Sequence, residues 1–296
     1  IMLVVCGSAT SWILSNLSRN RGGLYGRLTC EIKVSPFNLK ECEDYFKNEN
    51  IEMSRYDIVQ SYMVFGGIPY YLSYFKKGMS FEGNADNILF GKNPRLKDEF
   101  NRLFNAIFSN PEDCKKIIRL LAKKHVGFTR EEIAKETGLP FGGGLTDTLN
   151  ALVESDFIQR YRPYNVSGKV SFYKLIDNFS LFWLKYVEPN TEDINFMTDN
   201  MTSNIMRVWR GVAFEEVCWQ HIGQIKRALG ISGVSSSISA WSVKGNDNKE
   251  GVQIDLLIIR NDNVVNLCEM KFAGDIYSID KEEDAKIRNR IQTLIN

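Results

Sequence analysis

The spacing of hydrophobic residues divides the chain into stretches of different periodicity. Residues 1–6 are a continuous apolar run, as in a buried parallel strand, and a second strand is predicted at 28–34. Helical spacing then dominates residues 39–108, with Gly- and Pro-containing interruptions at 66–69 and 91–94. This pattern predicts a small piece of α/β core followed by a helical lid.

The next stretch predicts a different unit. Three helices are expected at residues 112–125, 129–138 and 144–155, followed by two strands at 157–161 and 170–176. Thr129 and Glu132 have the spacing of a capping box, which marks the start of the second helix. Three helices and a hairpin in this order predict a winged helix-turn-helix. A strongly apolar helix at 179–187 is expected to pack against it.

The last stretch returns to mixed structure. It predicts one long helix at 206–229, three strands at 238–243, 252–260 and 264–272, and a charged helix at 280–294.

Composition narrows the class of protein. The chain has 296 residues, of which 44% are hydrophobic and 25% charged, as in ordinary globular proteins. A net charge of +1 excludes a global field that would drive binding to nucleic acid or membrane. No stretch approaches the roughly 18 apolar residues of a membrane span, and the apolar start is too short for a signal peptide. The six cysteines contain no C-x-x-C pair, which favours a reducing cytoplasm over a disulfide framework or zinc site.

The clearest chemical signal is Asp255 followed by Glu269 and Lys271. A three-residue turn centred on Asp262 would place Asp255 directly opposite Glu269, with Lys271 on the same face. Two adjacent carboxylates repel each other unless a cation lies between them, and their oxygens suit Mg²⁺ or Mn²⁺. Lys271 could then stabilise developing charge on a phosphoryl group or position the attacking water.

An alternative is a pair of solvated charges on an ordinary hairpin. A turn of two or four residues would move one carboxylate to the other face. The apolar neighbours Leu267, Cys268 and Phe272 favour the functional interpretation, because charged groups are rare in apolar strands unless they are paired or bound to a ligand.

The order of these residues resembles that of the PD-(D/E)XK nucleases. Glu215, in G-V-A-F-E-E, matches that family's helical Glu, Asp255 its metal-binding Asp, and Glu269 and Lys271 its E-x-K. The resemblance covers the segment 204–296 and implies Mg²⁺-dependent cleavage of phosphodiester bonds, with Asp255 and Glu269 as metal ligands. The family normally has a further core strand after the last helix, so we expect this domain to be incomplete at its C-terminal end.

The N-terminal segment resembles the second half of the archaeal-type AAA ATPases found in bacteria. The motifs are C-G-S-A-T-S-W, G-L-Y-G-R, S-P-F-N-L-K-E and G-G-I-P-Y-Y-L, in that order. The resemblance implies that Ser8 acts as a sensor of the nucleotide and that Arg27 lies near the γ-phosphate. No G-x-x-x-x-G-K-S/T motif occurs, so nothing cradles the phosphates. Because the chain also begins with Ile1 inside a strand, we expect a fragment that does not hydrolyse ATP alone. ATP is then a ligand of the intact parent, which could oligomerise through the ATPase part.

The charges of the winged helix argue against tight DNA binding. Its third helix contains Asp147, Glu154 and Asp156 but no Lys or Arg, and would repel phosphates. A structural or protein-contacting role is favoured, although basic residues around the wing could touch a nucleic acid backbone: Arg160, Arg162, Lys169 and Lys174. The aromatic run Tyr70, Tyr71, Tyr74 and Phe75 is expected in the core of the lid.

The sequence therefore predicts a cytoplasmic, multidomain α/β protein without a membrane segment. Its expected parts are an AAA ATPase remnant at 1–36, a helical lid at 37–110, a winged helix-turn-helix at 111–190 and a PD-(D/E)XK-like domain at 204–296. Its predicted function is that of an ATPase fragment joined to a metal-dependent nuclease-like domain. The alternatives are a catalytically silent scaffold for protein interaction and a winged-helix DNA-binding regulator.

Overall fold

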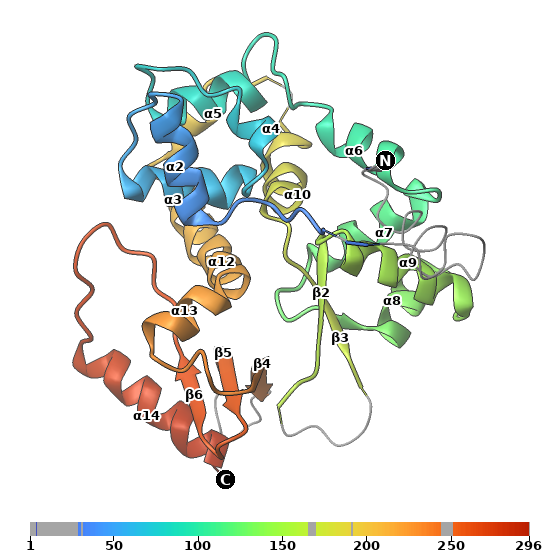
Figure 1. The fold of residues 1–296 in the computed structure, drawn as a ribbon, viewed down its shortest axis with the longest axis vertical. Helices are drawn as coiled ribbons and strands as arrows, with labels where there is room; N and C mark the ends of the chain where they lie inside the picture. The colour runs from blue at the N-terminus through green and yellow to red at the C-terminus, as the bar shows by residue number, and fades with distance from the viewer. Residues whose placement is uncertain are drawn as a thin grey trace. The chain divides into compact units, whose positions relative to one another are not determined.

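A computed structural model describes residue 4 and residues 29–30, 32–164, 170–190, 192–243 and 251–295. The protein is a mixed α/β chain with two three-stranded sheets among these residues, and Figure 1 labels its elements. It divides into two compact units, one of residues 1–160 and 173–201 and the other of residues 161–172 and 202–296. Ser8, Arg27 and most of the predicted ATPase remnant lie outside the described residues.

The first unit begins with the helices expected of the lid. They are α2 (Leu39–Asn48), α3 (Arg55–Phe65), α4 (Pro69–Leu72), α5 (Phe81–Leu89) and α6 (Glu99–Ile107). Polar caps fix their starts: Asn38 forms a capping box with Glu41, and the Ser54 hydroxyl accepts the Asp57 N–H. Gly66, with a φ of 63°, ends α3 and directs the chain into α4.

Aromatic side chains form much of the core of this unit. The Phe100 and Trp183 rings stack with centroids 4.7 Å apart, and Tyr71 lies 4.7 Å from Phe179. Tyr71 and Phe75 are buried as expected, but the prediction was wrong for Tyr70, which is 56% exposed. Its ring turns outward because α4 is a single short turn that buries only Tyr71 and Leu72.

The predicted winged helix lies in the same unit. Its elements are α7 (Pro111–Leu121), β1 (Phe128–Thr129), α8 (Arg130–Thr137), α9 (Gly143–Glu154), β2 (Ile158–Tyr161) and β3 (Phe172–Leu175). The capping box of Thr129 and Glu132 is present, and the left-handed Gly138 ends α8. The sequence did not predict β1, which pairs with β3 to give a sheet of order β1-β3-β2.

The apolar segment after the wing differs from its prediction. It forms α10 (Asn178–Phe182) and then a π-helix, η2 (Trp183–Val187), in place of one regular helix. It packs on α3 of the lid as well as reaching the winged helix, where Arg119 of α7 makes two hydrogen bonds to Glu188. The aromatic partners that fill the lid core draw this segment toward α3.

A short helix, α11 (Phe196–Asn200), closes the first unit. The Asp86 carboxylate of α5 is buried and accepts the backbone N–H groups of Met197 at 2.7 Å and Thr198 at 3.0 Å. It therefore caps a helix more than a hundred residues away in the sequence.

The second unit contains α12 (Asn204–Gln220), α13 (Ile222–Ala228), the strands β4 (Ser236–Val243), β5 (Val252–Arg260) and β6 (Val265–Cys268), and α14 (Lys281–Ile295). The single long helix predicted at 206–229 is in fact two helices. The break falls at His221, whose ring nitrogen Nδ1 lies 2.7 Å from the Val217 carbonyl oxygen and competes with the backbone for it.

The three strands form an antiparallel sheet of order β4-β5-β6, and α14 runs beside it (Figure 1). The hydrophobic core of this unit includes Tyr161 from the end of β2. The buried residues of the core are Tyr161, Trp219, Ile231, Ala240, Leu256 and Ile258. None of the described helices is long and apolar enough to cross a lipid bilayer.

Candidate functional site

The register of the β5–β6 hairpin is the foundation of the site. The Arg260 N–H donates to the Val264 carbonyl at 2.9 Å, which leaves a three-residue turn at 261–263 with Asn263 in the left-handed region. Leu256 pairs with Cys268 and Leu257 with Leu267. The register predicted from the sequence is therefore confirmed for residues 256–259 with 265–268, and continued by one residue it would bring Asp255 opposite Glu269.

The third strand is shorter than predicted. β6 ends at Cys268, and Glu269 and Lys271 lie in the extended segment that follows it. The reason is local: the Met270 N–H donates to Asp255 Oδ2 at 3.2 Å, so a side chain takes the place of the next backbone partner in the ladder.

Asp255 is half-buried between the fully buried residues Ile254 and Leu256 of β5. Burial raises the pKa of its carboxyl above the ordinary value, and the neighbouring charge of Glu269 raises it further. The Met270 N–H, Lys271 and Arg290 act in the opposite direction without cancelling this effect. Ionisation of Asp255 is therefore less favourable here than in water.

Glu269 and Lys271 are directly paired. The Lys271 Nζ atom lies 2.7 Å from Glu269 Oε1 and 3.4 Å from Glu283 Oε1 of α14. Burial alone would lower the pKa of Lys271, but its bonds to the two glutamates raise it above the ordinary value. Lys271 therefore remains a cation beside the carboxylate pair at neutral pH.

Helix α14 supplies two residues that the sequence analysis missed. Arg290 Nη1 lies 2.8 Å from Glu269 Oε2, and Glu283, two turns earlier on the same face, reaches Lys271. Asp280 fixes the start of α14 by accepting the Glu283 N–H at 2.8 Å. The signal in the sequence was the pair Glu283 and Arg290, two opposite charges seven residues apart on the helix that follows the E-x-K segment. Their order, acid before base, is complementary to Glu269 and Lys271.

Glu215 lies on α12, on a different side of the sheet from α14. Trp219 of α12 packs with Leu256 and Ile258, and Asp255, one residue out of phase, points to the other face. Cys218, also on α12, is influenced by both Glu215 and Asp255. Burial raises the pKa of its thiol to about 12, and the nearby charges, including those of Glu215 and Asp255, raise it further. The Trp219 indole also donates to the Asp255 carbonyl at 3.1 Å.

Asp255 and Glu269 offer the oxygen ligands that Mg²⁺ prefers, and burial, together with the charge of Glu269, raises the pKa of Asp255. Within the described ranges, however, no three or more His, Cys, Asp and Glu side chains gather as metal ligands. Both Glu269 oxygens are instead paired with protein cations, Lys271 and Arg290. The structure thus places two carboxylates beside two protein cations, Lys271 and Arg290, that pair with Glu269.

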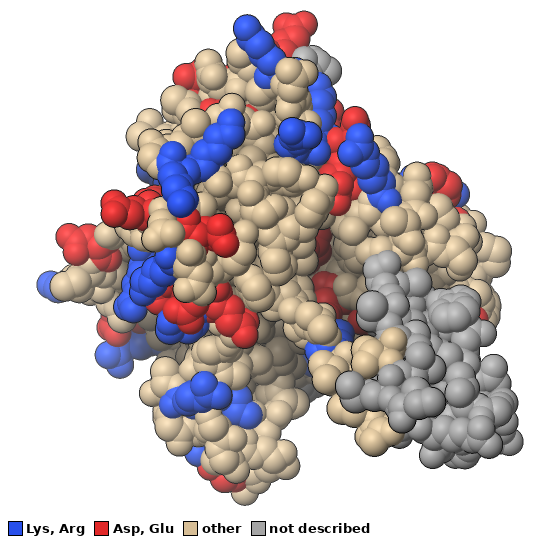
Figure 2. Space-filling model, turned by 45° about the horizontal axis from the view of Figure 1, so that its top comes forward, with Lys and Arg blue, Asp and Glu red and all other residues tan. Residues whose placement is uncertain are grey.

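The segment predicted to be a winged helix carries charged residues of both signs. Asp156, at the end of α9, pairs with Lys33 at 2.7 Å, and Arg160 and Arg162 are exposed. Lys174, expected to reach a nucleic acid backbone, is only 3% exposed, because it lies on β3 within the sheet, so this expectation was wrong. Lys169 lies outside the described residues. In Figure 2, acidic and basic side chains alternate over the face shown, without a continuous basic stripe.

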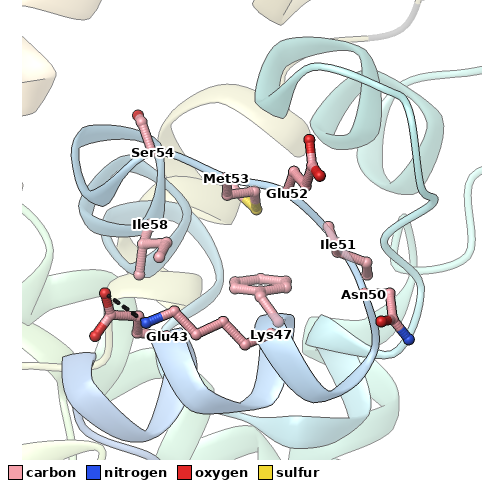
Figure 3. Close-up of a pocket in the computed structure, with 9 residues that line it drawn as sticks. Glu43, Lys47, Asn50, Ile51, Glu52, Met53, Ser54 and Ile58 are labelled. Carbon is pink, nitrogen blue, oxygen red and sulfur yellow. Dashed lines mark ion pairs between the residues drawn. The ribbon is translucent and has the colours of Figure 1, made fainter.

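A separate hollow of about 540 Å³ lies in the first unit between α2 and the start of α3. Figure 3 shows Ile51, Met53 and Ile58 along its wall, with Glu43 and Lys47 at its rim. Glu43 pairs with Lys47 at 3.2 Å and with Arg55 at 3.1 Å. The charged groups of the rim thus satisfy one another, and we assign the hollow no role.

The chain is similar to the "Uncharacterized protein MJECL04" of Methanocaldococcus jannaschii, with 27% identity over 266 residues. The match covers 88% of this chain and 57% of that protein, so the chain spans little more than half the length of the relative. No model of a protein family matches the chain, and no solved structure matches it.

Proposed function

We propose that the β5–β6 hairpin carries a metal-dependent phosphodiesterase site of the PD-(D/E)XK type that acts on nucleic acid. The observation that supports this proposal is the β5–β6 register, which pairs Leu256 with Cys268 and, continued by one residue, brings Asp255 opposite Glu269, with Lys271 two residues farther along. Metal-dependent cleavage of a phosphodiester needs carboxylates to bind the metal and a cation to stabilise the phosphate. Asp255, Glu269 and Lys271 supply these groups, whereas a hairpin with a purely structural role does not require them.

In this proposal Asp255 and Glu269 hold a Mg²⁺ ion. The ion, when bound, would polarise the scissile phosphate and acidify a water molecule. Lys271 remains protonated between two glutamates, so it can donate hydrogen bonds to a phosphate oxygen and offset its growing negative charge. The resemblance gives the helical Glu215 a role at the same site, but α12 packs on the face of the sheet opposite to the Asp255 side chain, so we assign Glu215 no contact with this ion.

The test is cleavage of single- and double-stranded DNA and RNA by the protein with Mg²⁺ or Mn²⁺. Glu269→Ala and Lys271→Ala should each lower cleavage by about a hundredfold or more, the scale of a lost electrostatic contact in an active site. Asp262→Asn is the matched control, because Asp262 is a carboxylate on the same hairpin that pairs with Arg260 at the turn. Cleavage that survives both substitutions would rule out this site.

A catalytically silent scaffold is the second candidate. It is favoured by the ion pairs of Glu269 with Lys271 and Arg290, which balance the charge of the carboxylate without a metal. A folded protein that neither cleaves any substrate nor binds Mn²⁺ would support this candidate. Binding that requires both Asp255 and Glu269 would support the nuclease.

For the intact parent we propose ATP binding at an N-terminal P-loop, with Ser8 and Arg27 near the γ-phosphate and the winged helix passing motion to the second unit. The support is the ordered set of N-terminal motifs alone. ATP hydrolysis by an extended protein should fall with Arg27→Ala if this assignment holds.

A DNA-binding role for the winged helix would depend on Arg160 and Arg162, which are exposed. Duplex binding that survives Asp255→Asn but falls with Arg160→Ala or Arg162→Ala would favour this regulator over the nuclease. The acidic α9 and the Lys33–Asp156 pair favour a protein partner for this surface instead.

A further inference from the structure

Arg290 occupies a distinctive place among the charges of the hairpin site. Its Nη1 atom lies 2.8 Å from Glu269 Oε2, and its charge also acts on Asp255, where it opposes the rise in the carboxyl pKa. The guanidinium side chain is 20% exposed and that of Glu269 is 12% exposed. One cation of the protein therefore pairs with Glu269 from a partly buried position, beside Asp255.

Helix α14, which carries Arg290, is attached to the hairpin without burying any of its own residues. No residue of Lys281–Ile295 is buried, and the pairs of the outer face, Glu282 with Lys286 and Asp284 with Arg288, stay within the helix. Among the described residues, ion pairs join α14 to the segment after β6 at Arg290 with Glu269 and at Glu283 with Lys271. These polar contacts hold α14 against the sheet together with the half-buried Ile287 and Leu294.

We propose that Arg290 is an internal counter-ion of the Asp255–Glu269 pair, which a divalent cation must displace in order to bind. Arg290 would thereby set the cation affinity of the site, and binding would release α14 from the hairpin. The inference rests on the proposed function for the presence of a metal at this pair.

The physical reason is competition for the same charge. Two carboxylates at one site bind a single cation strongly, because the cation removes their mutual repulsion. Arg290 and a metal ion would each relieve the repulsion between the carboxylates. The presence of Arg290 therefore lowers the free energy that a metal ion gains by binding. If Arg290 only oriented Glu269 for the metal, its removal would weaken metal binding, as the loss of a supporting hydrogen bond does. The two roles predict changes of opposite sign.

The experiment is calorimetric titration of Mn²⁺ into the full chain. Arg290→Gln should bind Mn²⁺ about tenfold more tightly than the wild type, the factor that corresponds to an ion pair of about 1.4 kcal/mol. Arg288→Gln is the matched control, because Arg288 lies on the same helix, is 76% exposed and pairs with Asp284 away from the hairpin. Its Mn²⁺ affinity should equal that of the wild type.

A second measurement follows the helix itself. In the wild type, Mn²⁺ should speed hydrogen exchange of the α14 amides, and Glu269→Gln should abolish this effect together with Mn²⁺ binding. Neither readout requires catalytic activity, and thermal melting would establish that each variant is folded.

The outcomes separate the two proposals. Mn²⁺ binding that depends on Glu269 but is unchanged or weaker in Arg290→Gln would overturn the counter-ion role and leave the metal site standing. If neither the wild type nor Arg290→Gln binds Mn²⁺, the metal site itself fails, and the inference fails with it. Tighter Mn²⁺ binding in Arg290→Gln but not in Arg288→Gln, together with loss of Mn²⁺ binding in Glu269→Gln, supports both the metal site and the counter-ion role.

Discussion

The carboxyl of Asp255 carries a measurable penalty for being charged in the folded chain. Burial and the adjacent Glu269 raise its pKa above 3.8, the value expected of an unfolded chain. An acid with a raised folded pKa takes up protons more readily when folded, so its charge lowers stability at every pH above that pKa. This penalty disappears as the pH falls through the raised pKa toward 3.8.

We therefore expect Asp255→Asn to be more stable than the wild type at pH 7, because the amide keeps an acceptor for the Met270 N–H and removes the charge. The difference in the free energy of unfolding, measured in urea, should shrink steadily as the pH is lowered. Asp262→Asn is the control of opposite sign, since the bond from Arg260 lowers the pKa of Asp262. A wild type that is more stable than Asp255→Asn at pH 7 would contradict this account.

At the scale of elements, the junction of β1 and β3 depends on Gly127. This residue has a φ of 74°, and a Cβ placed on it would lie 2.0 Å from the Tyr173 carbonyl oxygen of β3. Gly138, at the end of α8, has a similar φ of 72° but no atom within 4 Å of such a Cβ. The two glycines therefore share a backbone conformation and differ in the space around them.

Gly138→Ala should destabilise the protein by about 1 kcal/mol, the cost of a left-handed conformation for a residue with a side chain. Gly127→Ala should have a larger effect, about 3 kcal/mol, because β1 must also move away from β3. Urea denaturation of both variants measures the difference directly. Equal losses in the two variants would mean that β1 does not need its close approach to β3.

The sequence predicted well the features that depend on residues close together in the chain. The Thr129–Glu132 capping box and the β5–β6 register follow from interactions within a few residues, and both are present. The pairing of β1 with β3 and the Arg290–Glu269 bond join segments whose separation no short motif encodes. The same is true of Asp86, whose capping of α11 follows from tertiary packing that periodicity does not reveal.

At the scale of the whole molecule, one short segment of chain contributes to both compact units. Phe157, just before β2, packs in the first unit with its ring centroid 4.8 Å from that of Phe104. Tyr161, at the end of β2, belongs to the second unit and lies 5.5 Å from Trp219 by the same measure. Both side chains are buried.

Phe157→Ala and Tyr161→Ala should each destabilise the fold by about 3 kcal/mol, as expected for removing a buried aromatic ring, but in different places. Hydrogen exchange resolved by peptide should show Phe157→Ala speeding exchange in α6 and α7, and Tyr161→Ala speeding it in β4 and β5, since stability is local within a chain of several cooperative units. If both variants instead speed exchange equally in both sets of peptides, the two units unfold as one. The division into two compact units would then have no counterpart in the energetics of the chain.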